Sequence, residues 1–136
     1  MEKKVRHYHV TAAVISHQGK ILIAQRPFDD AHGGLWEFPG GKQKPGESLE
    51  QCLVREIAEE LNIRIEVTEY LFRVDHQYDH IQITLHVFLC QLQDGIPECK
   101  QVQDWKWIEF SEMDRYEFTE ADRKVIERLK EFDQIF

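Results

Sequence analysis

The clearest pattern in the chain is the alternation of apolar and polar positions over residues 81–92, IQITLHVFLCQL. A period of two places the apolar side chains on one face of an extended strand. Residues 8–16 are rich in β-branched and small apolar types, and residues 21–26 continue this pattern after the turn-forming sequence HQGK at 17–20. These stretches predict a hairpin of two strands and a third, longer strand.

A different period appears after a glycine-rich loop, where apolar residues recur at every fourth position: Leu49, Leu53, Ile57 and Leu61. This spacing forms one stripe along an α-helix. Ser48 is a good N-cap, and Gln51 three residues later completes a capping box. Asn62 tolerates the left-handed conformation that ends many helices. The sequence therefore predicts a helix between Ser48 and Asn62.

The rest of the chain predicts a mixed α+β layout in which strands, a helix, further strands and a second helix follow one another. The second helix is expected over residues 119–132, with Thr119 and Asp122 resembling a capping box. Three further segments are expected to be extended: residues 36–38, 63–78 and 105–110. A chain of 136 residues is expected to form one domain over residues 1–136.

Charge and composition narrow the classes of function. The chain has 17 basic and 25 acidic residues and a net charge of −8, which argues against binding a nucleic-acid polymer or an anionic membrane surface. No apolar run approaches the length of ~18 residues that a transmembrane helix needs. Three cysteines without a C-x-x-C pair, and an N-terminus without a signal-peptide core, favour a cytoplasmic protein. The sequence leaves a monomer and a homodimer open.

Three acids crowd the first predicted helix. At about 100° per residue, Glu56, Glu59 and Glu60 fall within roughly a quarter-turn, bordering the apolar stripe. Like charges at this spacing repel, although Arg55 can pair with Glu59 four residues on. One interpretation is a solvated acidic face. The other is a hard-cation site, because clustered carboxylates are the ligands that Mg²⁺ and Mn²⁺ prefer.

The loop before this helix favours the second interpretation. Gly40, Gly41 and Gly46 allow the backbone to approach a ligand closely, and Lys42 is near enough to contact a phosphate. The loop lacks the G-x-x-x-x-G-K-[ST] pattern of a P-loop. An acidic helix beside such a loop suits a complex of a divalent metal with a pyrophosphate group.

The spacing of these residues resembles the Nudix box, G-x5-E-x7-R-E-U-x-E-E-x-G-U, where U is a bulky aliphatic residue. Gly41, Glu47 and residues 55–63 match eight of its nine specified positions, and the departure is Asn62 in place of glycine. Four further segments resemble the MutT-type branch of the family: residues 24–27, 35–42, 81–88 and 121–130. This resemblance implies the Nudix fold, an α/β/α sandwich with a mixed β-sheet packed between helices.

The resemblance also implies roles for individual residues. The cofactor would be Mg²⁺, with Mn²⁺ able to substitute for it. The implied metal ligands are the carbonyl of Gly40 and the carboxylates of Glu56, Glu59 and Glu60. Glu56, Arg55 and Glu59 are the implied catalytic residues, with Glu56 as the general base and Arg55 orienting a carboxylate. Glu47 would support the site.

The implied reaction is hydrolysis of a nucleoside triphosphate to the monophosphate and pyrophosphate by attack of water on the β-phosphorus. The implied substrates are oxidised nucleotides such as 8-oxo-dGTP, with CTP, dCTP or a modified pyrimidine as the alternative. A non-catalytic Nudix module is a further alternative, but such modules often lack a metal carboxylate. The implied substrate-binding residues are Arg26, Phe38, Lys42 and Asp122, and Asp122 has a simple helix cap as its other interpretation.

Some MutT relatives carry another glutamate in the loop before the last strand. Alignment on Gly95 and Trp107 places Gln101 at that position. Glu98 or Asp104 would take its place if the loop shifts.

Overall fold

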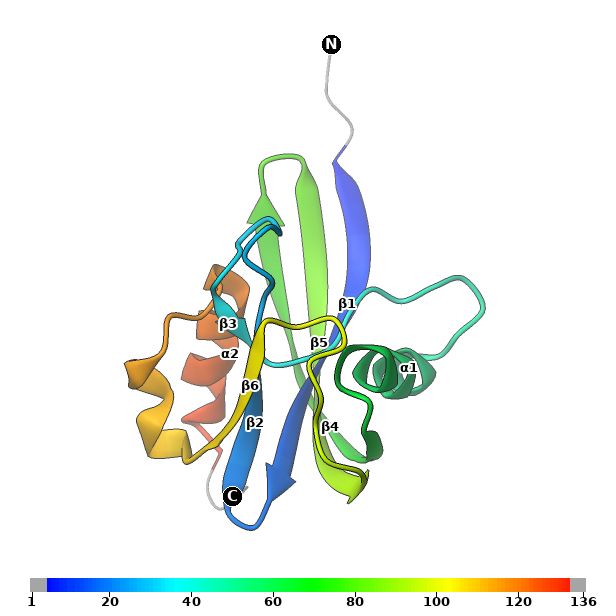
Figure 1. The fold of residues 1–136 in the computed structure, drawn as a ribbon. Coiled ribbons are helices and arrows are strands. Elements are labelled where there is room, and N and C mark those ends of the chain that lie inside the picture. Colours follow the sequence, from blue (N-terminus) through cyan, green and yellow to red (C-terminus); the bar gives the residue numbers. More distant parts are fainter. Residues whose placement is uncertain (1–4, 133–136) are drawn as a thin grey trace.

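The structure is a computed structural model that describes residues 5–132 (Figure 1). Its elements, in chain order, are β1 (Arg6–His17), β2 (Lys20–Gln25), β3 (Trp36–Glu37), α1 (Leu49–Leu61), β4 (Arg64–Tyr78), β5 (Ile81–Asp94), β6 (Asp104–Ile108), the 3₁₀ helix η1 (Phe110–Arg115) and α2 (Glu120–Leu129). Within the described residues, none of the helices is both long and apolar enough to cross a membrane.

The strands form one mixed sheet with the order β3-β2-β1-β5-β4, and β6 pairs with β2. β1 and β5 are parallel, whereas β1–β2, β2–β3, β2–β6 and β4–β5 are antiparallel. Figure 1 shows α1 and α2 on opposite sides of this sheet. The predicted α+β sandwich with a mixed sheet between helices is therefore confirmed.

Each face of the sheet carries its own apolar core. Leu53, Ile57 and Leu61 of α1 pack on one face against β1 and β5 residues such as Ile15 and Phe88. Val125, Ile126 and Leu129 of α2 belong to the core on the other face, together with Val14 and Val87. Because neighbouring residues of β1 and β5 point to opposite faces, consecutive apolar residues such as Val14 and Ile15 supply both cores.

The glycine-rich loop lies directly along β1. The backbone N–H of Thr11 donates to the carbonyl of Gly41 at 2.8 Å, and that of Ala13 donates to Pro39 at 2.8 Å. A Cβ atom at Gly40 would overlap the carbonyl oxygen of Thr11, so only glycine fits there. The loop is thereby held over the middle of the sheet, next to α1.

The ends of α1 match the prediction. Ser48 and Gln51 form the complete capping box, with the Gln51 N–H donating to Ser48 Oγ at 3.0 Å. Asn62 has φ 53° and ψ 38°, the left-handed conformation, and its N–H donates to the carbonyl of Ala58. Asparagine thus ends this helix where the family pattern has glycine.

Three expectations about the end of the chain were wrong in detail. Thr119 Oγ1 accepts from the Asp122 N–H, but the Thr119 N–H donates to the carbonyl of Trp36, so no reciprocal capping box forms. The helix ends at Leu129, short of residue 132. The strand predicted over 105–110 ends at Ile108, because Phe110 already begins η1, which the sequence pattern did not indicate.

Candidate active site

The helix α1 presents its three glutamates in two directions. Glu56 and Glu60 are four residues apart and line the same cavity. Glu59 lies on the other side of Glu56, with 41% of its side chain exposed, and it accepts a hydrogen bond from Arg55 Nη1 at 3.2 Å. A helix turns by about 100° per residue, which separates Glu59 from Glu60 by that angle. The structure therefore places Glu56 and Glu60 at one cavity, while Glu59 is joined to Glu56 through Arg55 Nη1.

Arg55 connects the carboxylates of the box. Its Nη2 and Nε donate to the two oxygens of Glu47 at 2.7 and 3.0 Å, and its Nη1 donates to Glu56 at 2.8 Å. Nη2 also donates to the backbone carbonyl of Lys42 at 3.2 Å. The hydrogen bonds from Arg55, and then that from the Lys44 N–H, lower the pKa of Glu47 to about 2. Arg55 thus fixes Glu56 and ties the glycine loop to α1, as the resemblance implied.

Glu60 is short of positive charge. Burial raises the pKa of its carboxyl well above the usual range, and the charges of Glu37 and Glu56 raise it further, against a hydrogen bond from the Gly40 amide. Its Oε2 is buried and has no hydrogen-bond partner among residues 5–132. A buried carboxylate oxygen without a partner beside other carboxylates is the environment that a cation relieves.

A divalent ion fits these residues. A Cβ atom at Gly41 would overlap the carboxylate of Glu56. Because glycine has no side chain, the Glu56 carboxylate can lie directly against the loop. In the described part of the chain, no three His, Cys, Asp or Glu side chains are arranged around one point as metal ligands. Mg²⁺ commonly takes only one or two carboxylates and completes its shell with water and substrate phosphates. Glu56 and Glu60 supply that pair, and ligation by Glu59 and the Gly40 carbonyl stays a prediction.

The cavity has a volume of about 390 Å³ and connects α1, the glycine loop and the start of α2. All four predicted substrate-binding residues line it: Arg26, Phe38, Lys42 and Asp122. Lys42 places its Nζ 4.2 Å from the centre of the Tyr8 ring. Phe38 is buried and stacks on Phe118 at 5.7 Å between ring centres, so it serves both the core and the cavity wall.

Asp122 is buried at the start of α2 and does more than cap it. Its Oδ1 accepts the Phe38 N–H at 3.2 Å, and its Oδ2 accepts the hydroxyl of Thr119. Burial, and secondarily the charge of Glu37, raises the pKa of Asp122 to about 7. The carboxyl therefore changes charge near neutral pH while it faces the cavity.

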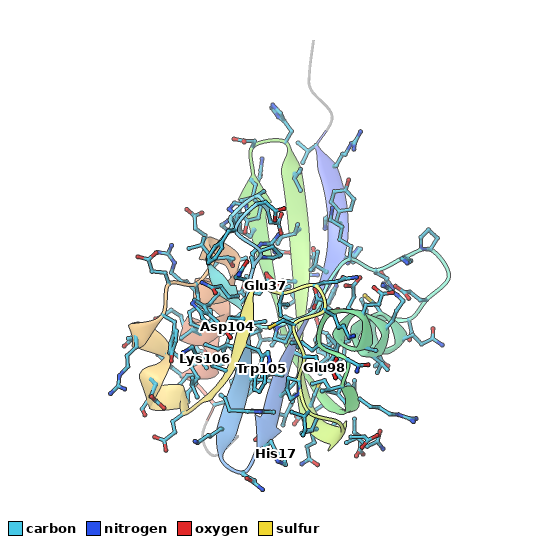
Figure 2. The ribbon with its side chains drawn as sticks, in the orientation of Figure 1. His17, Glu37, Glu98, Asp104, Trp105 and Lys106 are labelled. Carbon is cyan, nitrogen blue, oxygen red and sulfur yellow. The ribbon has the colours of Figure 1, made fainter. Side chains whose placement is uncertain are left out.

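Glu37 is the residue that reasoning from sequence missed. It lies on β3 (Figure 2), is half-buried, lines the cavity and accepts a hydrogen bond from Arg26 Nη1 at 2.7 Å. Burial raises the pKa of its carboxyl, and the charge of Arg26 opposes that shift. The available signal was a charged residue between the aromatic residues Trp36 and Phe38 of a short strand, where only a partnered charge is tolerated.

The loop before β6 supplies no further carboxylate to the cavity within residues 5–132. The N–H groups of Glu98 and Gln101 donate to the carbonyls of Leu61 and Glu60 at 2.9 and 3.1 Å, which fastens this loop to the end of α1. None of the residues named for the loop position, Gln101, Glu98 and Asp104, is among those lining the cavity. Figure 2 labels Glu98, which lies on this loop, and Asp104, which is the first residue of β6.

Comparison with known proteins agrees with this arrangement. A profile of the NUDIX domain matches residues 10–128. The chain is 39% identical over 120 residues to the CTP pyrophosphohydrolase of Escherichia coli K12, covering 87% of each protein. It is 33% identical over 130 residues to the 8-oxo-dGTP diphosphatase of Haemophilus influenzae, covering 95% of this chain and 94% of the relative.

Solved structures give the same result. The solution structure of the E. coli ORF135 protein superposes with a TM-score of 0.80 at 36% identity, covering 93% of this chain and 91% of that one. The crystal structure of a MutT NUDIX hydrolase from Burkholderia pseudomallei gives 0.82 at 27% identity, covering 91% and 98%. With Gly41, Glu56 and Glu60 of the box at one cavity and this similarity along most of its length, the chain belongs to the NUDIX domain family.

Proposed function

We propose that this protein is a metal-dependent nucleoside triphosphate pyrophosphohydrolase that releases a nucleoside monophosphate and pyrophosphate. The observation that carries this proposal is the shared cavity: Glu56 and Glu60 line it together with Phe38 and Asp122. A nucleotide needs both a metal–phosphate site and a pocket for its base, and here one cavity adjoins the residues for both.

The residues of the box have distinct tasks in this proposal. Glu56, Glu59, Glu60 and the Gly40 carbonyl hold Mg²⁺, or Mn²⁺ in its place, and Lys42 contacts a phosphate oxygen. The bound ion supplies the positive charge that offsets the phosphate oxygens during the reaction. Arg55 orients Glu56, and Glu47 holds Arg55 in place.

Glu56 is the proposed general base. It accepts a proton from the water whose oxygen bonds to the β-phosphorus, while the bond from that phosphorus to the α–β bridging oxygen breaks. The bridging oxygen leaves with the monophosphate, and the β- and γ-phosphates leave as pyrophosphate. The side chain of Glu56 is held for this task by Arg55 and by the space at Gly41.

Oxidised nucleotides such as 8-oxo-dGTP are the proposed substrates, which makes the protein an enzyme that sanitises the nucleotide pool. CTP, dCTP or a modified pyrimidine is the second candidate, favoured by the 39% identity to a CTP pyrophosphohydrolase. Asp122 bears on the choice, because an ionised carboxylate only accepts hydrogen bonds whereas asparagine also donates. We infer that Asp122 broadens the base preference or shifts it toward cytosine.

The proposed setting is the cytoplasm, with a small nucleotide as the partner and neither a nucleic-acid polymer nor a membrane as ligand. Three cysteines without a disulfide support a reducing compartment.

A screen of pyrophosphate release with Mg²⁺ tests the proposal over 8-oxo-dGTP, dGTP, CTP and dCTP, with both products identified. Hydrolysis of at least one triphosphate to its monophosphate is expected. Nucleotide binding without hydrolysis would instead identify a non-catalytic module. Asp122→Asn should change the ranking of the four substrates, and an unchanged ranking would refute the base-reading role of Asp122.

A further inference from the structure

Tyr78 occupies a position that the box residues and the base-reading carboxylate do not explain. It is the last residue of β4 and the only tyrosine that lines the nucleotide cavity in the described part of the chain. A neighbouring open pocket of about 570 Å³ shares Tyr78, His32 and Ile81 with that cavity. The Tyr78 side chain therefore stands at the boundary between the two spaces.

The Tyr78 ring is held from two sides. The ring of His76, two residues earlier on β4, contacts it edge-on with 4.4 Å between centres. The ring of His32, from the loop between β2 and β3, lies 5.1 Å away. His32 has φ 64°, a left-handed backbone conformation that is uncommon outside glycine. These contacts fix the plane of an aromatic side chain at the cavity wall.

The Tyr78 hydroxyl adds a polar group to this wall of the cavity. The backbone of Ala121, in the first turn of α2 that also carries Asp122, lowers the pKa of the phenol, but the effect of burial is larger. A protonated phenol has one O–H to donate. Burial raises the pKa of this phenol, which keeps that proton in place at neutral pH. An O–H donor thus accompanies the carboxylate acceptor of Asp122.

We propose that Tyr78 is a specificity-determining residue that contacts the nucleobase, with its ring packed on the base and its hydroxyl donating a hydrogen bond to the base edge. The inference rests on the proposed function, because it takes a nucleotide as the occupant of the cavity. A ring fixed in advance loses little conformational freedom when a base stacks on it, and the added donor lets the site distinguish base edges that Asp122 alone does not.

Equilibrium binding of 8-oxo-dGMP and CMP tests this without turnover or metal. Tyr78→Leu removes the ring and should weaken binding of the preferred nucleotide by about tenfold or more. Tyr78→Phe keeps the ring and removes the donor, and it should change the ratio of the two affinities by about threefold or more. Tyr70→Phe is the matched control, because Tyr70 donates to or accepts from His86 at 2.9 Å and does not line the cavity in the described residues.

Each outcome decides the matter. If the wild-type protein binds either monophosphate and both Tyr78 variants bind as it does, the inference is wrong and the proposed hydrolase function stands. If the wild-type protein neither binds a monophosphate nor hydrolyses a triphosphate, both the proposed function and the inference about Tyr78 are wrong. Steady-state kinetics provide a second test of the contact. In Tyr78→Leu, KM should rise while kcat stays within about threefold of the wild-type value. Thermal unfolding of both variants shows that they fold.

Discussion

Arg55 donates hydrogen bonds to both carboxylate oxygens of Glu47, at 2.7 and 3.0 Å. These bonds join the end of the glycine-rich loop to the middle of α1. The same guanidinium reaches Glu56 at 2.8 Å. Its planar fork matches a carboxylate in a way that an ammonium does not. The proposed general base is therefore positioned by a residue that itself depends on Glu47.

Arg55→Lys should keep the charge and lose this geometry. We expect kcat to fall by about 10- to 100-fold, as when other residues that orient a functional group are replaced, while the protein stays folded. Steady-state kinetics and thermal unfolding check this. Arg64→Lys, at the exposed start of β4, is the control. Wild-type kcat in Arg55→Lys would show that the fork does not position Glu56.

Glu47→Gln should destabilise the protein in a pH-dependent way. The pKa of Glu47 is lowered from 4.5 to about 2, so its stabilising contribution is fully present above pH 4.5 and is lost as the pH falls through 2. The variant should unfold at a lower temperature than the wild-type protein at pH 7, and the difference should shrink between pH 4.5 and 2. An equal difference at both ends of this range would contradict the assignment.

Gly41→Ala should lower the activity, whereas Gly46→Ala should lower only the stability of the protein. A Cβ at Gly41 overlaps only the flexible Glu56 carboxylate, so we expect kcat to fall at least about 100-fold through displacement of the base. Gly46 has φ 84° and open space around its Cβ position, so its alanine variant should lose about 1–2 kcal/mol of stability and keep its activity. Kinetics and urea unfolding of both variants measure this. Equal activity of the two variants would argue against the placement of Glu56.

Local patterns in the sequence were sufficient to predict most of the fold. Alternation in residues 81–92 corresponds to β5, because successive side chains of a strand point to opposite faces. The four-residue spacing from Leu49 to Leu61 corresponds to α1, because one side of this helix packs on the sheet. η1 was missed, since a 3₁₀ helix of 6 residues is too short to give a periodic signal. The end of α2 was misplaced by three residues, because Phe132 packs on Phe72 from beyond the helix.

For the site, the sequence indicated the residues and could not indicate their directions. The box spacing predicted Glu56, Glu59 and Glu60 as one group, but it did not indicate that Glu56 and Glu60 line the cavity whereas Glu59 does not. The pairing of Glu59 with Arg55 follows from their spacing of four residues. Glu37 was missed because its importance comes from Arg26, eleven residues away, and from the charge of Glu60 and Asp122 across the cavity. Such long-range pairing appears only when the chain is folded.

Asp122→Asn should stabilise the metal-free protein most at high pH. The pKa of Asp122 is raised from 3.8 to about 7, so its ionised form costs stability above pH 7, and this cost is relieved as the pH falls from 7 toward 3.8. The variant should be more stable than the wild-type protein at pH 8, on the order of a few kcal/mol, and the gain should be much smaller at pH 5. Urea unfolding at the two pH values measures it. A gain that does not depend on pH would contradict the raised pKa.

The central claim is that Glu56 and Glu60 would hold a divalent metal ion, and that the protein hydrolyses a nucleotide in the cavity that these two residues line. Its most direct test is pyrophosphate release from a nucleoside triphosphate, with and without Mg²⁺, by the wild-type protein and by Glu56→Gln, Glu60→Gln and Glu59→Gln. We predict release that requires Mg²⁺, with one monophosphate per pyrophosphate, and a loss of at least about 100-fold in each of the three variants. Release without a divalent metal, or wild-type rates in Glu56→Gln and Glu60→Gln, would contradict it.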